Sequence, residues 1–297
     1  MPASFREILR SGRILFFDGA MGTELAARGA ERSPAANVNA PEVVLAVHRA
    51  YREAGADVLM TNTLTASRPA LARSGDADQL SRYVAEGCRL AREAMGRGGY
   101  VAGDIGPTGE LLEPYGTMTE AAMRAALEEP ARLLAAEGVD LFLVETMSDA
   151  MEMTLAVQAC REAARQSQRD IPVAATMSFD PSRQGGFRTN MGVSPAEAAR
   201  AMVAAGADIL GANCGAITPE QMAEVVRQFR RAAKLPILAQ PNAGLPELRA
   251  GQTIFSLSPE AFAAGMMQVI EAGARLVGGC CGTTPAHIAA LVRALRK

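Results

Sequence analysis

Three of the five cysteines stand at positions where their thiols could bind a metal ion together. Cys214 lies in the stretch GANCG, and Cys280 and Cys281 lie in GGCCGTTPAHI. Each stretch follows a short apolar run that is typical of a buried strand. Three thiolates that meet at one point suit Zn²⁺, which accepts sulfur ligands at the corners of a tetrahedron. The sequence therefore predicts a zinc site made by Cys214, Cys280 and Cys281.

The number of ligands indicates what such a zinc site would do. Structural zinc sites are closed by four protein ligands, whereas catalytic sites keep one position open. Cys88 and Cys160 fall within predicted helices, residues 83–94 and 153–165, and we expect both thiols to be inert. Three ligands and an open position predict a catalytic site. Two alternatives remain: three buried core cysteines, or a vicinal pair that forms a redox disulfide.

Three thiolates favour chemistry at sulfur. They leave the metal centre with an excess of negative charge, which makes it poor at activating water but still able to bind a fourth thiol and lower its pKa. Transfer of an alkyl group to that sulfur needs no general-base histidine. The two histidines, His48 and His287, lie within predicted helices, and we expect both to be structural.

A recurring pattern predicts the elements that position these cysteines. Four segments place a glycine after a helix end and before an apolar run: residues 53–61, 137–145, 204–212 and 271–279. Glycine just past a helix adopts the left-handed conformation that ends it. Four further apolar runs complete a set of eight strands: residues 14–19, 100–106, 171–179 and 235–241. Helical stretches fit between them, such as residues 41–53, 121–137 and 219–234.

Eight alternating strands and helices predict an α/β fold, a single (β/α)8 barrel of the TIM type in one domain spanning residues 1–297. An open doubly wound sheet is less favoured, because residues 17–22 match a phosphate-binding glycine turn only loosely. Active sites of barrels lie at the carboxyl ends of the strands, and alternate strands share an interior layer. Cys214 and Cys280 end the sixth and eighth strands, so their thiols can meet. We expect Gly278, Gly279 and Gly282 to let Cys281 turn toward the same point.

Composition excludes several classes of function. The chain has 297 residues, is 49% hydrophobic and carries a net charge of −2, with no cluster of basic residues. These values predict a cytoplasmic protein that binds neither nucleic acid nor a membrane. The oligomeric state stays open, a homo-oligomer included.

Several motifs resemble those of the homocysteine S-methyltransferase family. They are FDGAMGTELAARG, HRAYREAGADVLMTNT, GDIGPTGE, LVETMSDA, GANCG, PNAGLP and GGCCGTTPAHI, and they run from about residue 13 to 290. PNAGLP followed by GGCCGTTP looks most like the homocysteine-binding module of cobalamin-dependent methionine synthase. The resemblance implies a zinc-dependent enzyme that transfers a methyl group to the thiol of homocysteine and forms methionine.

The resemblance also implies roles for individual residues. It gives Cys214, Cys280 and Cys281 as zinc ligands, and Asn242 as a ligand that occupies the open position without substrate. The alternative role of Asn242 is structural, as a turn former in PNAG. Substrate-binding positions are then expected among polar or backbone groups at strand ends: Asp18 and Glu145 for the ammonium group, the backbone of Gly19, Ala20 and Met21 for the carboxylate, and Thr63 and Asn213.

The methyl donor is where the sequence departs from the family. Members commonly read TNTFGAN where this chain reads TNTLTAS, and the chain has no tryptophan. Enzymes that use betaine hold a quaternary ammonium against aromatic rings, so betaine is disfavoured. A sulfonium such as S-methylmethionine, or a partner protein that carries methylcorrinoid or methylfolate, fits better. Two other readings remain: a thiol-binding subunit of a corrinoid system that acts on another thiol, and a metal-stabilised barrel without activity.

Overall fold

The computed structural model describes residues 3–249 and 252–296, and its centre is a barrel of eight parallel strands. The strands lie in the order β1-β12-β9-β8-β5-β4-β3-β2, and a bridge between Phe17 and Val58 joins the two end strands. This confirms the predicted barrel, and each of the eight predicted apolar runs supplies one strand. Their bounds are β1 Leu15–Phe16, β2 Val58–Met60, β3 Tyr100–Ile105, β4 Leu141–Met147, β5 Val173–Met177, β8 Ile209–Asn213, β9 Ile237–Gln240 and β12 Leu276–Val277.

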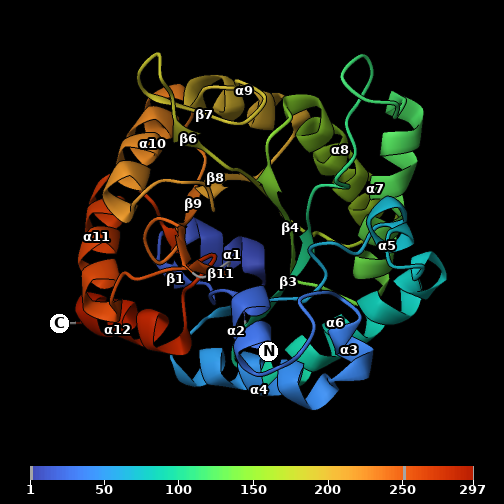
Figure 1. Cartoon of the computed structure of the whole chain (residues 1–297), viewed down its shortest axis with the longest axis horizontal. Helices are drawn as coiled ribbons and strands as arrows, with labels where there is room; N and C mark the ends of the chain where they lie inside the picture. Colours follow the sequence, from blue (N-terminus) through green and yellow to red (C-terminus); the bar gives the residue numbers. More distant parts are fainter. Residues whose placement is uncertain (1–2, 250–251, 297) are drawn as a thin grey trace.

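Helices surround the barrel as an outer ring (Figure 1). The long ones are α4 Pro41–Glu53, α6 Leu80–Met95, α7 Glu120–Ala136, α8 Ala150–Gln166, α9 Pro195–Ala205, α10 Pro219–Ala232, α11 Pro259–Glu271 and α12 Pro285–Leu295. Shorter helical segments are α1 Phe5–Arg10, α2 Met21–Ala27, α3 Ala36–Asn39, α5 Arg68–Ala72 and the 3-10 turn Ala77–Gln79. Two hairpins were not predicted: β6 Asp180–Pro181 with β7 Phe187–Arg188, and β10 Glu247–Arg249 with β11 Gln252–Ile254. None of the helices in the described ranges is long and apolar enough to cross a membrane.

Local signals set where these helices begin and end. Gly55, Gly138, Gly206 and Gly273 all have positive φ, as the recurring pattern predicted. Ser194 and Thr218 cap α9 and α10 through reciprocal side-chain and backbone bonds, and proline follows each cap. The strands therefore start at defined residues, which fixes the residues that reach the barrel mouth.

The barrel interior is filled by alternate residues of the strands, and the helix α1 covers the end of the barrel where the strands begin. Apolar side chains such as Leu141 and Leu143 form the interior cluster, and Phe5 of α1 belongs to it. Since strand side chains alternate between faces, the next interior position on β4 is Glu145. The same count on β8, from Ile209, reaches Asn213, and on β3 from Ala102 it reaches Asp104. The interior thus changes from apolar to polar at the carboxyl ends of the strands.

Candidate metal centre and active site

The three predicted thiols lie together at the barrel mouth. The Sγ atoms of Cys214, Cys280 and Cys281 are all within 4.8 Å of one another, and those of Cys214 and Cys281 are 3.9 Å apart. Thiols bonded to a tetrahedral zinc at 2.3 Å stand about 3.8 Å apart. The spacing therefore fits a metal ion bound by all three.

The backbone brings Cys214 and Cys280 together through the strand between them. The N–H of Cys214 donates to the carbonyl of Gln240 at 3.1 Å, and the N–H of Cys280 donates to the carbonyl of Pro241 at 2.9 Å. The carbonyl of Cys281 accepts from the N–H of Ala243 at 3.0 Å. The end of β9 thus serves as a spacer that sets the distance between the two cysteine segments.

The departure from strand geometry was predicted at Cys281, but one part of it lies at Cys214. Asn213 points into the barrel, so Cys214 would point outward on a regular strand. Its φ of 56° turns the chain instead and brings the thiol back to the mouth. On the other segment Gly282 has a φ of 77°, whereas Gly278 and Gly279 serve close packing: a Cβ on Gly278 would lie 2.7 Å from the carbonyl oxygen of Asp18.

The electrostatics of the three thiols favour a cation. Hydrogen bonds from Cys214 and Cys280 lower the pKa of Cys281 to about 3. Hydrogen bonds to Cys214 and Cys281, together with burial, raise the pKa of Cys280. Of these two thiols, that of Cys281 is therefore the readier to ionise. A divalent cation would displace the remaining protons, since metal ligands must be thiolates.

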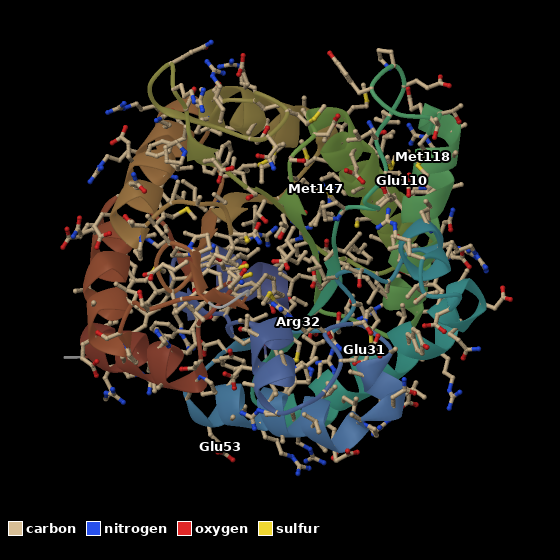
Figure 2. All side chains as sticks on the ribbon, viewed as in Figure 1. Glu31, Arg32, Glu53, Glu110, Met118 and Met147 are labelled. Carbon is tan, nitrogen blue, oxygen red and sulfur yellow. The ribbon has the colours of Figure 1, made fainter. Side chains whose placement is uncertain are left out.

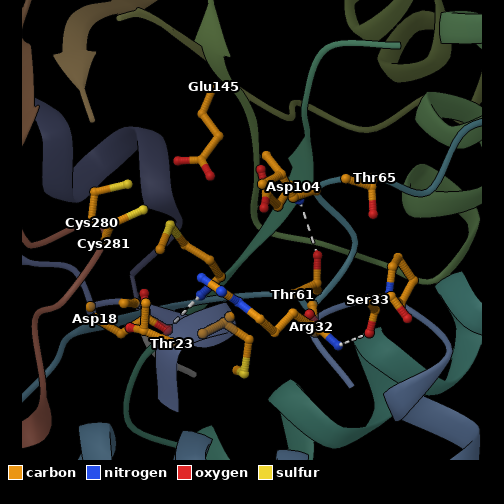
Figure 3. Close-up of a pocket in the computed structure, with 18 of the residues that line it drawn as sticks. Asp18, Thr23, Arg32, Ser33, Thr61, Thr65, Asp104, Glu145, Cys280 and Cys281 are labelled. Carbon is orange, nitrogen blue, oxygen red and sulfur yellow. Dashed lines mark hydrogen bonds between the residues drawn. The ribbon is translucent and has the colours of Figure 1, made fainter. Parts of the chain in front are cut away.

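Three carboxyl groups face the same pocket as the thiols. Asp18, Asp104 and Glu145 are 1%, 5% and 6% exposed and line the pocket with Cys280 and Cys281. Figure 3 shows the carboxyl groups around the space into which the two thiols point. Within the described residues, one oxygen of Asp18 and one of Asp104 have no hydrogen-bond partner.

Burial raises the pKa of each carboxyl group. For Asp104 the neighbouring carboxylates Glu145 and Asp18 add to the effect, and for Glu145 burial and then Cys214 raise the pKa to about 8. Buried carboxylates need a positive partner to ionise. An ammonium group in this pocket would meet that need.

Asn213 lies between the carboxyl group of Glu145 and the thiol of Cys280. It is fully buried, and its Nδ2 donates to Glu145 Oε2 at 3.2 Å and to Thr146 Oγ1 at 2.7 Å, and lies 3.9 Å from Cys280 Sγ. Its Oδ1 accepts from Thr176 Oγ1 at 2.6 Å and from the N–H of Thr146. Thr146 has a φ of 60°, which a β-branched residue rarely adopts. Asn213 therefore holds Glu145 in place rather than lining the pocket itself.

The loop after β1 lines the pocket, but its backbone is partly occupied. Gly19, Ala20 and Met21 are among the lining residues. The N–H of Ala20 donates to Thr283 Oγ1 at 3.0 Å, so it is not free for a carboxylate. A Cβ on Gly19 would lie 2.6 Å from the same Oγ1. Thr283 thus packs this loop against the cysteine segment.

Two other expected residues have structural contacts. Thr63 is buried outside the pocket lining, and its hydroxyl donates to the carbonyl of Asp104 at 2.7 Å. Asn242 is buried, with Nδ2 on the carbonyl of Gly215 and Oδ1 without a partner among the described residues. The histidines lie outside the pocket lining: His48 is buried in α4, and His287 bonds Thr284 and the carbonyl of Leu257.

Sequence reasoning missed two charged lining residues, Asp104 and Arg32. Asp104 ends a predicted strand in the motif GDIG, so its interior position could have been counted from Ala102. Arg32 lies in an irregular loop, where no periodicity places a side chain. Both bear on substrate binding below.

Comparison with known proteins agrees with this geometry. The sequence profile of the homocysteine S-methyltransferase family matches residues 15–295. The chain is 36% identical over 294 residues to methionine synthase from Mycobacterium tuberculosis, covering 94% of this chain and 24% of that protein. It is 29% identical to betaine–homocysteine S-methyltransferase 1 from Bos taurus, covering 97% and 74%. The chain thus spans about a quarter of the length of the methionine synthase it matches.

Solved structures resemble the whole barrel. The metallated homocysteine methyltransferase MmuM from Escherichia coli superimposes with a TM-score of 0.76 at 27% identity, covering 98% of this chain and 99% of that one. The oxidised form of the same protein gives a TM-score of 0.77 at 28% identity. The likeness therefore includes the strand ends that carry the three thiols and the carboxyl groups.

Proposed function

The chain belongs to the homocysteine S-methyltransferase family, a family of methyltransferase enzymes, and we propose that it transfers a methyl group to the thiol of homocysteine and forms methionine. One observation carries the proposal. A single pocket is lined by three buried carboxyl groups and by Cys280 and Cys281, whose thiols form a cluster with that of Cys214. The acceptor has a thiol for the cysteines and an ammonium group for the carboxyl groups.

Zinc is the proposed cofactor, held by Cys214, Cys280 and Cys281. Their spacing fits a tetrahedral ion, and soft sulfur ligands suit zinc better than magnesium or calcium. When bound, zinc would lower the pKa of the acceptor thiol and keep its sulfur electron-rich. Asn242, whose Oδ1 is buried without a partner in the described part of the chain, is the proposed fourth ligand in the absence of substrate.

The carboxyl groups orient the acceptor. Glu145 projects from β4 toward the thiols, and Asn213 fixes it through a hydrogen bond at 3.2 Å. Asp18 is held by the N–H of Met60, which bonds its Oδ2 at 3.1 Å and leaves Oδ1 for a ligand. We propose that the ammonium group binds Glu145 and Asp18, with Asp104 as a third acceptor. Homocysteine bound in this way would have its sulfur at the cysteines, with one side of that sulfur facing the mouth of the barrel.

The donor side of the pocket disfavours betaine. No aromatic side chain is among the described residues that line it, so nothing there offers a cation–π contact to a quaternary ammonium. We propose a sulfonium donor such as S-methylmethionine, which the chain would use without a partner protein. The similarity to a quarter of methionine synthase favours a second candidate, in which a corrinoid or folate partner delivers the methyl group.

Purified zinc-loaded protein, given homocysteine and S-methylmethionine, is expected to form methionine without any further protein. Mass spectrometry with a labelled methyl group measures the product. Methionine formed only when methylcobalamin replaces the sulfonium would support the partner system instead. No methionine with either donor, while zinc is bound, would contradict the proposed activity.

A further inference from the structure

Arg32 extends into the active-site pocket from the loop between α2 and α3. It lines the pocket together with Cys281 and Asp18, and its Nε lies 3.9 Å from the position that a Cβ on Gly22 would take. Its charge acts on the Cys281 thiol. Figure 2 shows Arg32 closer to the barrel axis than its neighbour Glu31, and Figure 3 shows it beside Asp18 and Thr23.

The guanidinium group of Arg32 is free to bind a ligand. Within the described part of the chain it makes no hydrogen bond or ion pair. The adjacent carboxylate, Glu31, instead accepts a hydrogen bond from Ser33 Oγ at 2.8 Å. By contrast, Arg28 on the neighbouring helix pairs with Glu24 at 2.9 Å.

The backbone around Arg32 is fixed rather than loose. Asn62 Nδ2 donates to the carbonyl of Ser33 at 3.0 Å and to Asn37 Oδ1 at 3.0 Å. Asn37 in turn donates to the carbonyls of Asn62 and Tyr83. The loop that carries Arg32 is therefore tied to the end of β2, which limits the positions that the guanidinium can reach.

We propose that Arg32 binds the carboxylate of the acceptor amino acid and selects acceptors that have one. The inference rests on the proposed function. With the sulfur at the cysteines and the ammonium group at Glu145 and Asp18, the carboxylate of homocysteine still needs a partner. It lies only a few bonds from the sulfur, so it must stay in the pocket that Cys281 and Arg32 both line.

The backbone loop alone offers fewer donors than the sequence predicted. The N–H of Ala20 is occupied by Thr283 Oγ1, which removes one donor from the expected carboxylate cradle. A guanidinium can supply two parallel N–H donors and a full positive charge. Arg32 is the cationic side chain among the described lining residues of this pocket, and it lies over the same loop, at Gly22.

The test measures binding of two thiols to zinc-loaded protein by calorimetry. One is homocysteine, and the other is aminopropanethiol, which keeps the thiol and the amino group but lacks the carboxylate. Arg32→Gln is expected to weaken homocysteine binding about tenfold and to leave aminopropanethiol binding unchanged. Arg32→Lys, which keeps the charge, is expected to recover part of the loss. Arg28→Gln removes a charge nearby but outside the pocket, and is expected to change neither affinity.

Several results would overturn the inference. An equal loss for both thiols in Arg32→Gln would mean that the arginine shapes the pocket without recognising the carboxylate. Unchanged homocysteine binding with a raised KM for the donor would assign Arg32 to the donor instead. If wild-type protein with bound zinc binds neither thiol, the proposed function itself is wrong, and the inference falls with it.

Discussion

Replacing Cys281 with serine is expected to remove most of the bound metal and to lower methyl transfer at least about a hundredfold, since loss of a metal ligand costs more than loss of the residues that orient it. A serine hydroxyl keeps its proton at neutral pH and cannot replace a thiolate. In the free protein, hydrogen bonds from Cys214 and Cys280 lower the pKa of Cys281, which favours the thiolate form that a metal ion needs. Metal content by mass spectrometry and methionine formation are the two measurements.

Cys88→Ala is the matched control for this substitution. Cys88 is buried in α6, and burial raises the pKa of its thiol to about 12, so it should bind no metal and take no part in transfer. The control is expected to keep its metal and its activity. A Cys281→Ser protein with wild-type metal content would show that the three thiols do not form the metal site.

Replacing Glu145 with glutamine is expected to weaken homocysteine binding by ten- to a hundredfold while the metal stays bound. An ammonium–carboxylate hydrogen bond contributes about 1.5–3 kcal/mol, which corresponds to roughly that range of affinity. The variant should also lose its preference for homocysteine over mercaptobutyrate, which has the thiol and the carboxylate but no amino group. Calorimetric titration with both thiols gives the two affinities.

The pH dependence of binding should change in the same variant. Burial and then Cys214 raise the pKa of Glu145 to about 8, so the free carboxyl group keeps its proton at neutral pH. Ammonium binding requires the ionised form. Wild-type affinity should therefore rise as pH approaches 8 and gain nothing more from this group above it, whereas Glu145→Gln should rise less steeply.

Glu152→Gln is the control for loss of a buried carboxylate. Glu152 accepts hydrogen bonds from Thr108 outside this pocket, and its replacement should leave homocysteine binding unchanged. If Glu145→Gln binds homocysteine like wild type but no longer transfers methyl groups, Glu145 would be a base rather than the partner of the ammonium group.

Much of the barrel could be predicted because its signals are local and periodic. A glycine such as Gly138 or Gly206 ends a helix by its own φ, and the apolar run after it needs burial on both faces. The helix predicted at residues 41–53 matches α4, Pro41–Glu53, because a first-turn proline starts it. The meeting of Cys214 with Cys280 followed from strand order, and the glycines beside Cys281 predicted that its thiol joins them.

The parts that escaped prediction depend on tertiary contacts. The role of α1 as a plug appears only when Phe5 packs into the barrel interior. The positive φ of Cys214 has no local signature, because the neighbouring strand β9 determines it through its backbone bonds. Arg32 reaches the pocket because Asn62, far along the chain, fixes its loop. Such placements follow from the assembled barrel and not from residue spacing.

Zinc-edge X-ray absorption, recorded before and after addition of homocysteine, tests whether the acceptor thiol binds a zinc ion held by the three cysteines. We expect three sulfur atoms around zinc in the free protein, from Cys214, Cys280 and Cys281, and a fourth when homocysteine binds. A sulfur number that stays the same while calorimetry shows homocysteine bound would contradict this expectation, because the acceptor thiol would then bind away from the metal.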